Sequence, residues 1–97
     1  MHSKQLQIQK LLVERYGFVF KQNVAGAIGT RAIFVHLYGL EASVSEYRVC
    51  FYGNSISGGD SADYFPAKNK PRCFDADQKS QIKAYLEQTI ALRGQPA

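Results

Sequence analysis

An alternating run of apolar and aromatic residues, Ile33–Tyr38, constrains the fold of this chain more than any other feature. Period-two geometry sends alternate side chains of a strand to opposite faces. One face would carry Ile33, Val35 and Leu37, and the other Phe34, His36 and Tyr38. A strand face in contact with water normally carries Thr, Lys or Glu. We therefore expect the aromatic face to be covered by another element, a second subunit or a ligand.

The two ends of the chain have the spacing of amphipathic helices. In Ser3–Tyr16, apolar residues recur every three or four positions, with Ser3 as the N-cap and Gly17 as the stop. Near the other end, Asp75 is followed three positions later by Gln78, which is the spacing of a capping box. We expect this second helix to be the longer one and to end at Gly94. Its apolar face consists of Ile82, Tyr85, Leu86 and Ile90.

Segments with the period-two pattern of strands lie between the helices. They are Phe18–Val24, Thr30–Tyr38 and Glu46–Tyr52. Glycines between the first two predict a hairpin, and Gly39–Ser45 is expected to be a connection. A fourth strand at Asp63–Ala67 is left open, and Pro66 would confine it to an edge. Because the connections are short, we expect an antiparallel meander.

The chain is expected to form one α+β domain over residues 1–97, with residues 94–97 as a frayed tail, since 97 residues can bury one modest core. The element order predicts a two-layer sandwich with both helices packed on one face of an antiparallel sheet. The face toward the helices would carry Phe18, Phe20, Ile33, Val35, Leu37, Val49 and Phe51. The other face would carry Val19, Phe34, His36, Tyr38, Cys50 and Tyr52.

This second face is the candidate binding surface, because aromatic rings bordered by cations suit both unpaired bases and a second copy of the chain. Binding is expected through Phe34, His36, Tyr38 and Tyr52, with Lys21 and Arg48 at the border. A second candidate is the basic loop of Lys68, Lys70 and Arg72, which is suited to phosphate or an acidic protein surface. Two alternatives stay open: the long connection folds over the face, or the helices lie on opposite faces.

Residues that commonly carry catalysis or bind metals are sparse. Cys50 and Cys73 lack the neighbours of a zinc site, so neither metal nor cofactor is expected, and whether the two are bridged is left open. His36 is the one histidine within a predicted strand, and with Cys50 it defines a remote Cys–His enzyme alternative. Without paired carboxylates or a nucleophile motif, an enzyme is the minority interpretation.

Two classes of function fit these features. The first is a non-enzymatic interaction module that forms a homodimer and binds a protein partner or ligand, as an accessory or inhibitor protein of a mobile element. The second is a single-stranded nucleic-acid-binding protein, which the net charge of +4 permits. No apolar run reaches membrane-spanning length and Met1–Lys10 lacks a signal-peptide pattern, so we expect a cytoplasmic protein with reduced thiols and no membrane partner.

Overall fold

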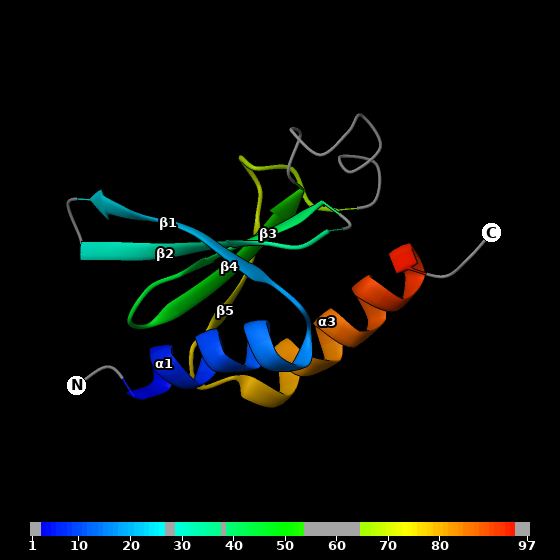
Figure 1. Cartoon of the computed structure of the whole chain (residues 1–97), viewed down its shortest axis with the longest axis horizontal. Coiled ribbons are helices and arrows are strands. Elements are labelled where there is room, and N and C mark those ends of the chain that lie inside the picture. Colours follow the sequence, from blue (N-terminus) through cyan, green and yellow to red (C-terminus); the bar gives the residue numbers. More distant parts are fainter. Residues whose placement is uncertain (1–2, 27–28, 38, 54–64, 95–97) are drawn as a thin grey trace.

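The computed structural model describes residues 3–26, 29–37, 39–53 and 65–94. The helical elements are α1 (Ser3–Lys10), the π-helical turn η1 (Leu11–Arg15) and α3 (Lys79–Gly94). The strands are β1 (Val19–Gly26), β2 (Gly29–Val35), β3 (Leu40–Val44), β4 (Arg48–Gly53) and β5 (Arg72–Asp75). All five strands form one antiparallel sheet in the order β1-β2-β3-β4-β5 (Figure 1). The predicted α+β class and the antiparallel meander are therefore confirmed.

The N-terminal helix ends where the sequence predicts. Ile8 and Leu12 are fully buried, as their helical spacing indicates. Gly17 adopts a φ of +76°, a left-handed conformation that glycine reaches at little cost. The backbone N–H of Phe18 then donates to the carbonyl of Leu12 at 2.9 Å, which closes the helix end. The chain thereby reverses from the helix directly into β1.

The β1–β2 hairpin extends past the rest of the sheet. β1 pairs with β2 as far as Gly26 and Gly29, whereas β2 pairs with β3 only from Ala32, opposite Val44, onward. Residues 24–26 and 29–31 therefore form a two-stranded projection, here called the β1–β2 arm (Figure 1). A β-bulge at Lys21 increases the local twist of β1 before the arm begins.

The central strand β3 was expected to be a connection, and that prediction is wrong. Leu40–Val44 pairs with β2 along one edge and with β4 along the other, and its five side chains are all buried. Leu40, Ala42 and Val44 do alternate with polar residues, but the strand is short and includes Ala, Glu and Ser, which have low or modest strand propensity. Its strand character depends on its two neighbours, which the local sequence does not identify.

The edge strand beside β4 also differs from the prediction. Residues 65–67 do not form a strand, and the rest of the predicted Asp63–Ala67 segment lies outside the described residues. The edge position is taken by β5 (Arg72–Asp75), which pairs with β4 and places Cys73 opposite Cys50. The predicted strand Glu46–Tyr52 corresponds to β4.

The side chains of β2 face in the opposite directions from those predicted. Residues directly opposite one another share a face of a sheet, and Phe34, Ala42 and Phe51 form one such row. The Phe51 ring lies 5.4 Å from the ring of Tyr85 in α3, so this row faces the helices. Phe34 is only 3% exposed and belongs to the hydrophobic core, whereas Ile33 lies on the other face, in register with Ser43.

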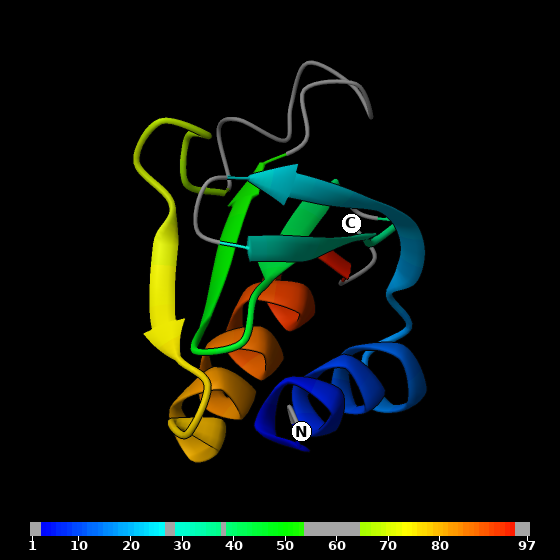
Figure 2. The ribbon, with the colours of Figure 1, turned by 90° about the vertical axis from the view of Figure 1, so that its left-hand side faces the viewer.

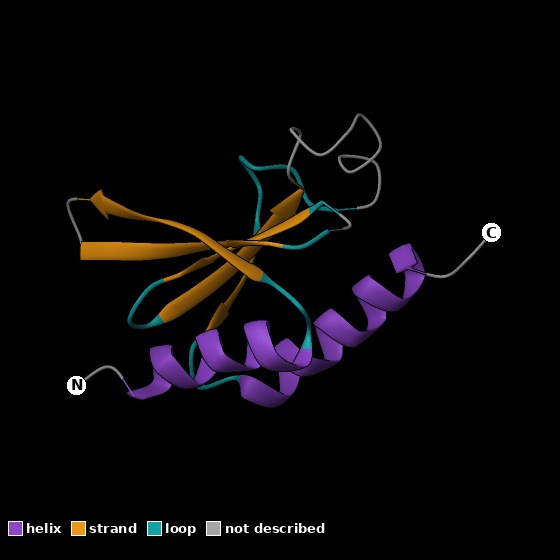
Figure 3. Cartoon of the chain, in the orientation of Figure 1, coloured by secondary structure: helices purple, strands orange, loops and turns teal. Residues whose placement is uncertain are grey.

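Both helices lie along the same side of the sheet in the ribbon views (Figures 2 and 3). The core combines side chains from α1, η1 and α3 with Ala42, Val44 and Val49 of the sheet. For β4 the predicted faces agree with the structure, since Val49 and Phe51 belong to this core. The alternation in β2 also ends earlier than predicted: Leu37 lies in a turn and is 76% exposed.

The predicted capping box with Asp75 as N-cap is wrong, because Asp75 is the last residue of β5 and α3 begins at Lys79. The backbone N–H of Asp75 does donate to Gln78 Oε1 at 2.9 Å, but this hydrogen bond lies in the turn between β5 and α3. Ile82 and Leu86 are fully buried, and the Tyr85 ring lies 5.5 Å from that of Phe74. The C-terminal helix therefore packs on the sheet through the face that its sequence predicts.

The orientation of Phe34 predicts a large difference between two phenylalanine substitutions. Phe34→Ala removes a buried ring and is expected to lower the free energy of unfolding by about 3–5 kcal/mol. Phe20→Ala removes a ring that is 51% exposed and meets Phe34 at 5.6 Å, and is expected to cost about 1 kcal/mol. Urea denaturation of the two variants measures this difference. Equal costs would contradict the assignment of Phe34 to the core.

Candidate binding groove beneath the β1–β2 arm

A groove of about 830 Å³ lies between the β1–β2 arm, α1 and the turn that joins β3 to β4. The arm and its base contribute Arg31 and Phe20, and α1 contributes Gln5 and Gln9. The β3–β4 turn contributes the segment Ser45–Arg48. Because the arm projects past β3, this space is not filled by the rest of the sheet. Its volume is within the range of pockets that bind organic ligands.

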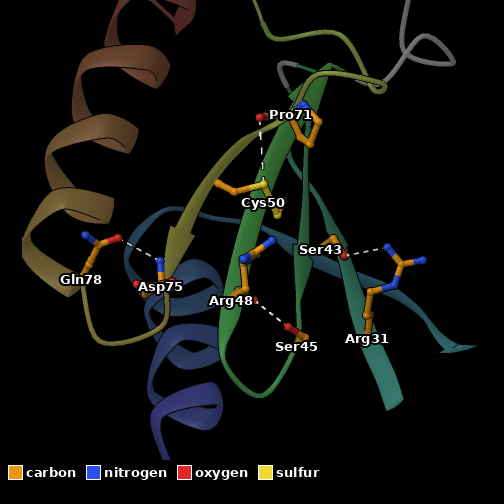
Figure 4. Close-up of a disulfide and its surroundings, with 9 residues drawn as sticks. Arg31, Ser43, Ser45, Arg48, Cys50, Pro71, Asp75 and Gln78 are labelled. Atoms are coloured by element: carbon orange, nitrogen blue, oxygen red, sulfur yellow. Dashed lines mark hydrogen bonds between the residues drawn. A yellow bond between two sulfur atoms is a disulfide. The ribbon is translucent and has the colours of Figure 1, made fainter. Parts of the chain in front are cut away.

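Two arginines line the groove, and their side chains extend along the face of the sheet away from α1. Arg31 Nη1 donates to Ser43 Oγ at 3.3 Å, which orients this guanidinium on the face of the sheet that carries Cys50 (Figure 4). Arg48 extends from the same face at the start of β4, next to a turn that Ser45 closes by donating to the Arg48 carbonyl. Both arginines are exposed, and within the described residues neither makes an ion pair with a carboxylate. Their charges are therefore available to an anionic ligand.

Two exposed aromatic rings line the same groove. Phe20 is 51% exposed, and Tyr47, in the β3–β4 turn, is 75% exposed. A hydrogen bond with Glu46 is the main cause that raises the pKa of the Tyr47 hydroxyl. Glu46 also supplies a carboxylate to the groove lining. Exposed rings beside guanidinium groups offer surfaces for stacking as well as charge.

The helix side of the groove is fixed to the sheet. Gln5 Nε2 donates to the backbone carbonyl of Val44 at 3.3 Å, which ties α1 to the end of β3. Gln9 lies one turn further along α1 and also lines the groove. These amides can donate and accept hydrogen bonds at the wall of the groove.

The predicted sheet-face residues do not form one surface. Phe34 is in the core, and His36 is 5% exposed, with its ring 5.0 Å from that of Phe18. Tyr38 lies outside the described residues. Arg48 lines the groove, whereas Lys21 and Tyr52 lie around Glu41. Of the five predicted residues that the structure describes, it therefore brings only Lys21 and Tyr52 together, around Glu41.

Glu41 is a buried carboxylate on the face opposite the helices. The Tyr52 hydroxyl donates to Glu41 Oε2 at 2.6 Å, and Lys21 Nζ lies 3.7 Å from Oε1. Burial, followed by this hydrogen bond to Glu41, raises the pKa of Tyr52 far above its usual value. A buried charge requires such partners, so Lys21 and Tyr52 satisfy Glu41 rather than face a ligand.

The two cysteines form a disulfide between β4 and β5. Cys50 is therefore bonded to Cys73, and it lies on the opposite face of the sheet from the core in which His36 packs against Phe18. The Cys–His pair of the enzyme alternative is not formed in this structure. The bridge, which the sequence left open, is present, so the expectation of reduced thiols is not met in this structure.

The basic loop lies apart from the groove, beside β5. Lys68 and Lys70 are exposed, and the Arg72 guanidinium lies over the Phe74 ring at 4.6 Å from its centre. These three cations are accessible, as expected from the sequence, but none of them lines the groove.

Within the described residues, no three His, Cys, Asp or Glu side chains gather as metal ligands would. The described helices include none with the length and apolar character needed to cross a bilayer. No family model, curated protein or solved structure matches the chain.

Five of the residues that line the groove were not predicted from the sequence: Gln5, Gln9, Phe20, Arg31 and Tyr47. These residues share no signal in the sequence, because they come from separate elements that become neighbours only in the folded chain.

The buried His36 predicts a dependence of stability on pH. Burial lowers its pKa from the usual 6.5, while a hydrogen bond with the backbone of Tyr16 opposes this shift. The unfolded state therefore binds a proton more readily than the folded state, and stability falls as the pH decreases through about 6.5. Denaturation between about pH 7.5 and pH 5.5 should show this loss in the native protein and a reduced loss in His36→Gln. An identical pH dependence in both proteins would contradict it.

Proposed function

We propose that this protein is a binding module that holds single-stranded nucleic acid in the groove beneath the β1–β2 arm. The observation that supports the proposal is the combination of Arg31 and Arg48 with the exposed rings of Phe20 and Tyr47 around one space. Single-stranded nucleic acid is bound by this pairing of cations, which contact the phosphates, with rings on which bases stack.

The expected contacts follow from the positions of these groups. The guanidinium groups of Arg31 and Arg48 would pair with successive phosphates. Unstacked bases would lie on Phe20 and Tyr47, and the amides of Gln9 would hydrogen-bond to base edges. The net charge of +4 would add a general attraction for the strand. Because stacking accepts any base, this module would bind with little sequence preference.

The proposal predicts a specific response to salt and substitution. Fluorescence anisotropy with a labelled single-stranded oligonucleotide should show binding that weakens steeply as salt is raised. Phe20→Ala and Tyr47→Ala should each weaken it by about 5-fold to 150-fold, since stacking contributes roughly 1–3 kcal/mol per base. Arg31→Ala and Arg48→Ala should each reduce the slope of log affinity against log salt by about 0.7.

Two further variants control this experiment. Lys79 is an exposed cation that lines a separate hollow between the helices and is not among the residues that line the groove. Lys79→Ala should therefore leave the salt slope close to that of the native protein. Glu46→Gln removes a carboxylate from the groove and should strengthen binding. Absence of binding at low salt, or binding that Arg31→Ala and Arg48→Ala leave unchanged, would contradict the proposal.

A second candidate function is self-association through β1, the homodimer predicted from the sequence. β1 is an edge strand that is exposed along nearly all of its eight residues, and Val19 within it is 64% exposed. Leu6 and Val13, two turns apart on the N-terminal helix, are also exposed. The bulge and charge at Lys21 oppose pairing over the first half of this edge, which makes this candidate the weaker one.

Light scattering over a concentration series tests self-association directly. If β1 forms the interface, the native protein should give twice the mass of the 10.9 kDa chain, and Val19→Lys should return it to the mass of one chain. A native protein that keeps the mass of one chain at every concentration would rule the homodimer out. A protein partner bound on this surface, a cytoplasmic location, and a role as accessory or inhibitor protein of a mobile element remain predictions from the sequence.

A further inference from the structure

The disulfide joins the short edge strand β5 to its one neighbour in the sheet, β4. Cys50 and Cys73 lie directly opposite each other, with their Cα atoms 4.0 Å apart. β5 has four residues and pairs only with β4. An edge strand this short has few ladder hydrogen bonds to hold it in place.

The C-terminal half of β5 is held in the fold by contacts other than the disulfide. Phe74 is 5% exposed, and its ring meets those of Phe51 at 6.1 Å and Tyr85 at 5.5 Å. The following residues are held by the hydrogen bond from the Asp75 N–H to Gln78 and by that from the Ala76 N–H to the Tyr47 carbonyl at 2.8 Å. These contacts would persist in the dithiol form of the protein.

The N-terminal half of β5 has much weaker support. Arg72 is exposed, and the loop before it contains exposed Lys68 and Lys70. The loop is held at its far end by the hydrogen bond from the Gly53 N–H to the Pro66 carbonyl at 2.7 Å. Among the described residues, the ties between Pro66 and Phe74 that reach the sheet are the pairing with β4, the contact of Arg72 with the Phe74 ring, and the disulfide.

We propose that the Cys50–Cys73 disulfide is a redox switch that fixes or releases the basic loop of Lys68, Lys70 and Arg72. Both cysteines are half-buried and lie on the face of the sheet away from the helices, where a reductant can approach (Figure 4). After reduction the Cys73 thiol has an acceptor within reach, since the Pro71 carbonyl oxygen lies 4.0 Å from its sulfur. The inference does not depend on the proposed nucleic-acid function.

The chemical step is thiol–disulfide exchange with a dithiol reductant. A thiolate of the reductant attacks one protein sulfur, forms a mixed disulfide and displaces the other cysteine as a thiolate. The second thiol of the reductant then displaces the remaining protein sulfur. The protein gains two electrons and two protons, and the reductant leaves as a cyclic disulfide. In a reducing compartment the dithiol, with its loop released, would be the resting form.

Amide hydrogen exchange distinguishes a redox switch from a disulfide that only stabilises the fold. The short Cα separation makes Cys50–Cys73 a pair without ladder hydrogen bonds, so its neighbours Phe51–Arg72 and Val49–Phe74 are the pairs that exchange them. Reduction of the full chain with dithiothreitol should speed exchange of the Arg72 amide by about tenfold or more. The Phe74 and Ile82 amides should keep their protection, and reoxidation should restore that of Arg72.

Each alternative outcome overturns the proposal. Unchanged protection at Arg72 would mean that the disulfide is inert, and equal loss at Phe74 and Ile82 would mean that it supports the whole fold. Absence of the Cys50–Cys73 bridge from the protein under oxidising conditions, measured by alkylation and mass, would also overturn it. The Cys50→Ala/Cys73→Ala variant should behave as the reduced protein and should not respond to dithiothreitol; if this variant does not fold, the reduction of the native chain still decides the question.

Discussion

β3 is paired along both edges, to β2 and to β4, and all of its side chains are buried. Its two faces nevertheless meet different environments. Ala42 and Val44 join the hydrophobic core, whereas Glu41 and Ser43 lie on the other face. An unpaired carboxylate inside an apolar core would cost on the order of several kcal/mol, so Glu41 favours the orientation in which it lies on the face away from the helices. Every neighbouring strand then takes its orientation from β3.

This constraint explains the arrangement of the polar groups on the opposite face. Glu41 is satisfied by Tyr52 and Lys21, and Ser43 accepts from Arg31. Arg31 is thereby oriented where β2 leaves β3 and continues into the arm. The groove exists because Ala32 is the first residue of β2 to pair with β3, which leaves the arm without a neighbour on that side. The proposed nucleic-acid site is thus a consequence of the unequal lengths of adjacent strands.

The elements with local signals could be predicted from the sequence, and those that depend on distant partners could not. Helical spacing located both helices, and Gly17 ends the first as predicted, because these signals act over a few residues. The Asp75–Gln78 pair instead lies in the turn before α3, so it did not locate the start of that helix. β2 was recognised as a strand but its faces were reversed, since apolar residues occupy both sides of it and alternation gives no preference. The groove could not be predicted, because Phe20 and Tyr47 are brought together only by the register of the strands between them.

Native-state hydrogen exchange at β3 tests this account most directly. A central strand directs each amide to one of its two neighbours, so the amides of Leu40–Val44 should be among the slowest to exchange and should open only with global unfolding. Rapid exchange across Leu40–Val44, at the rate of an exposed connection, would contradict the five-stranded sheet and, with it, the orientation of Phe34 and the origin of the groove.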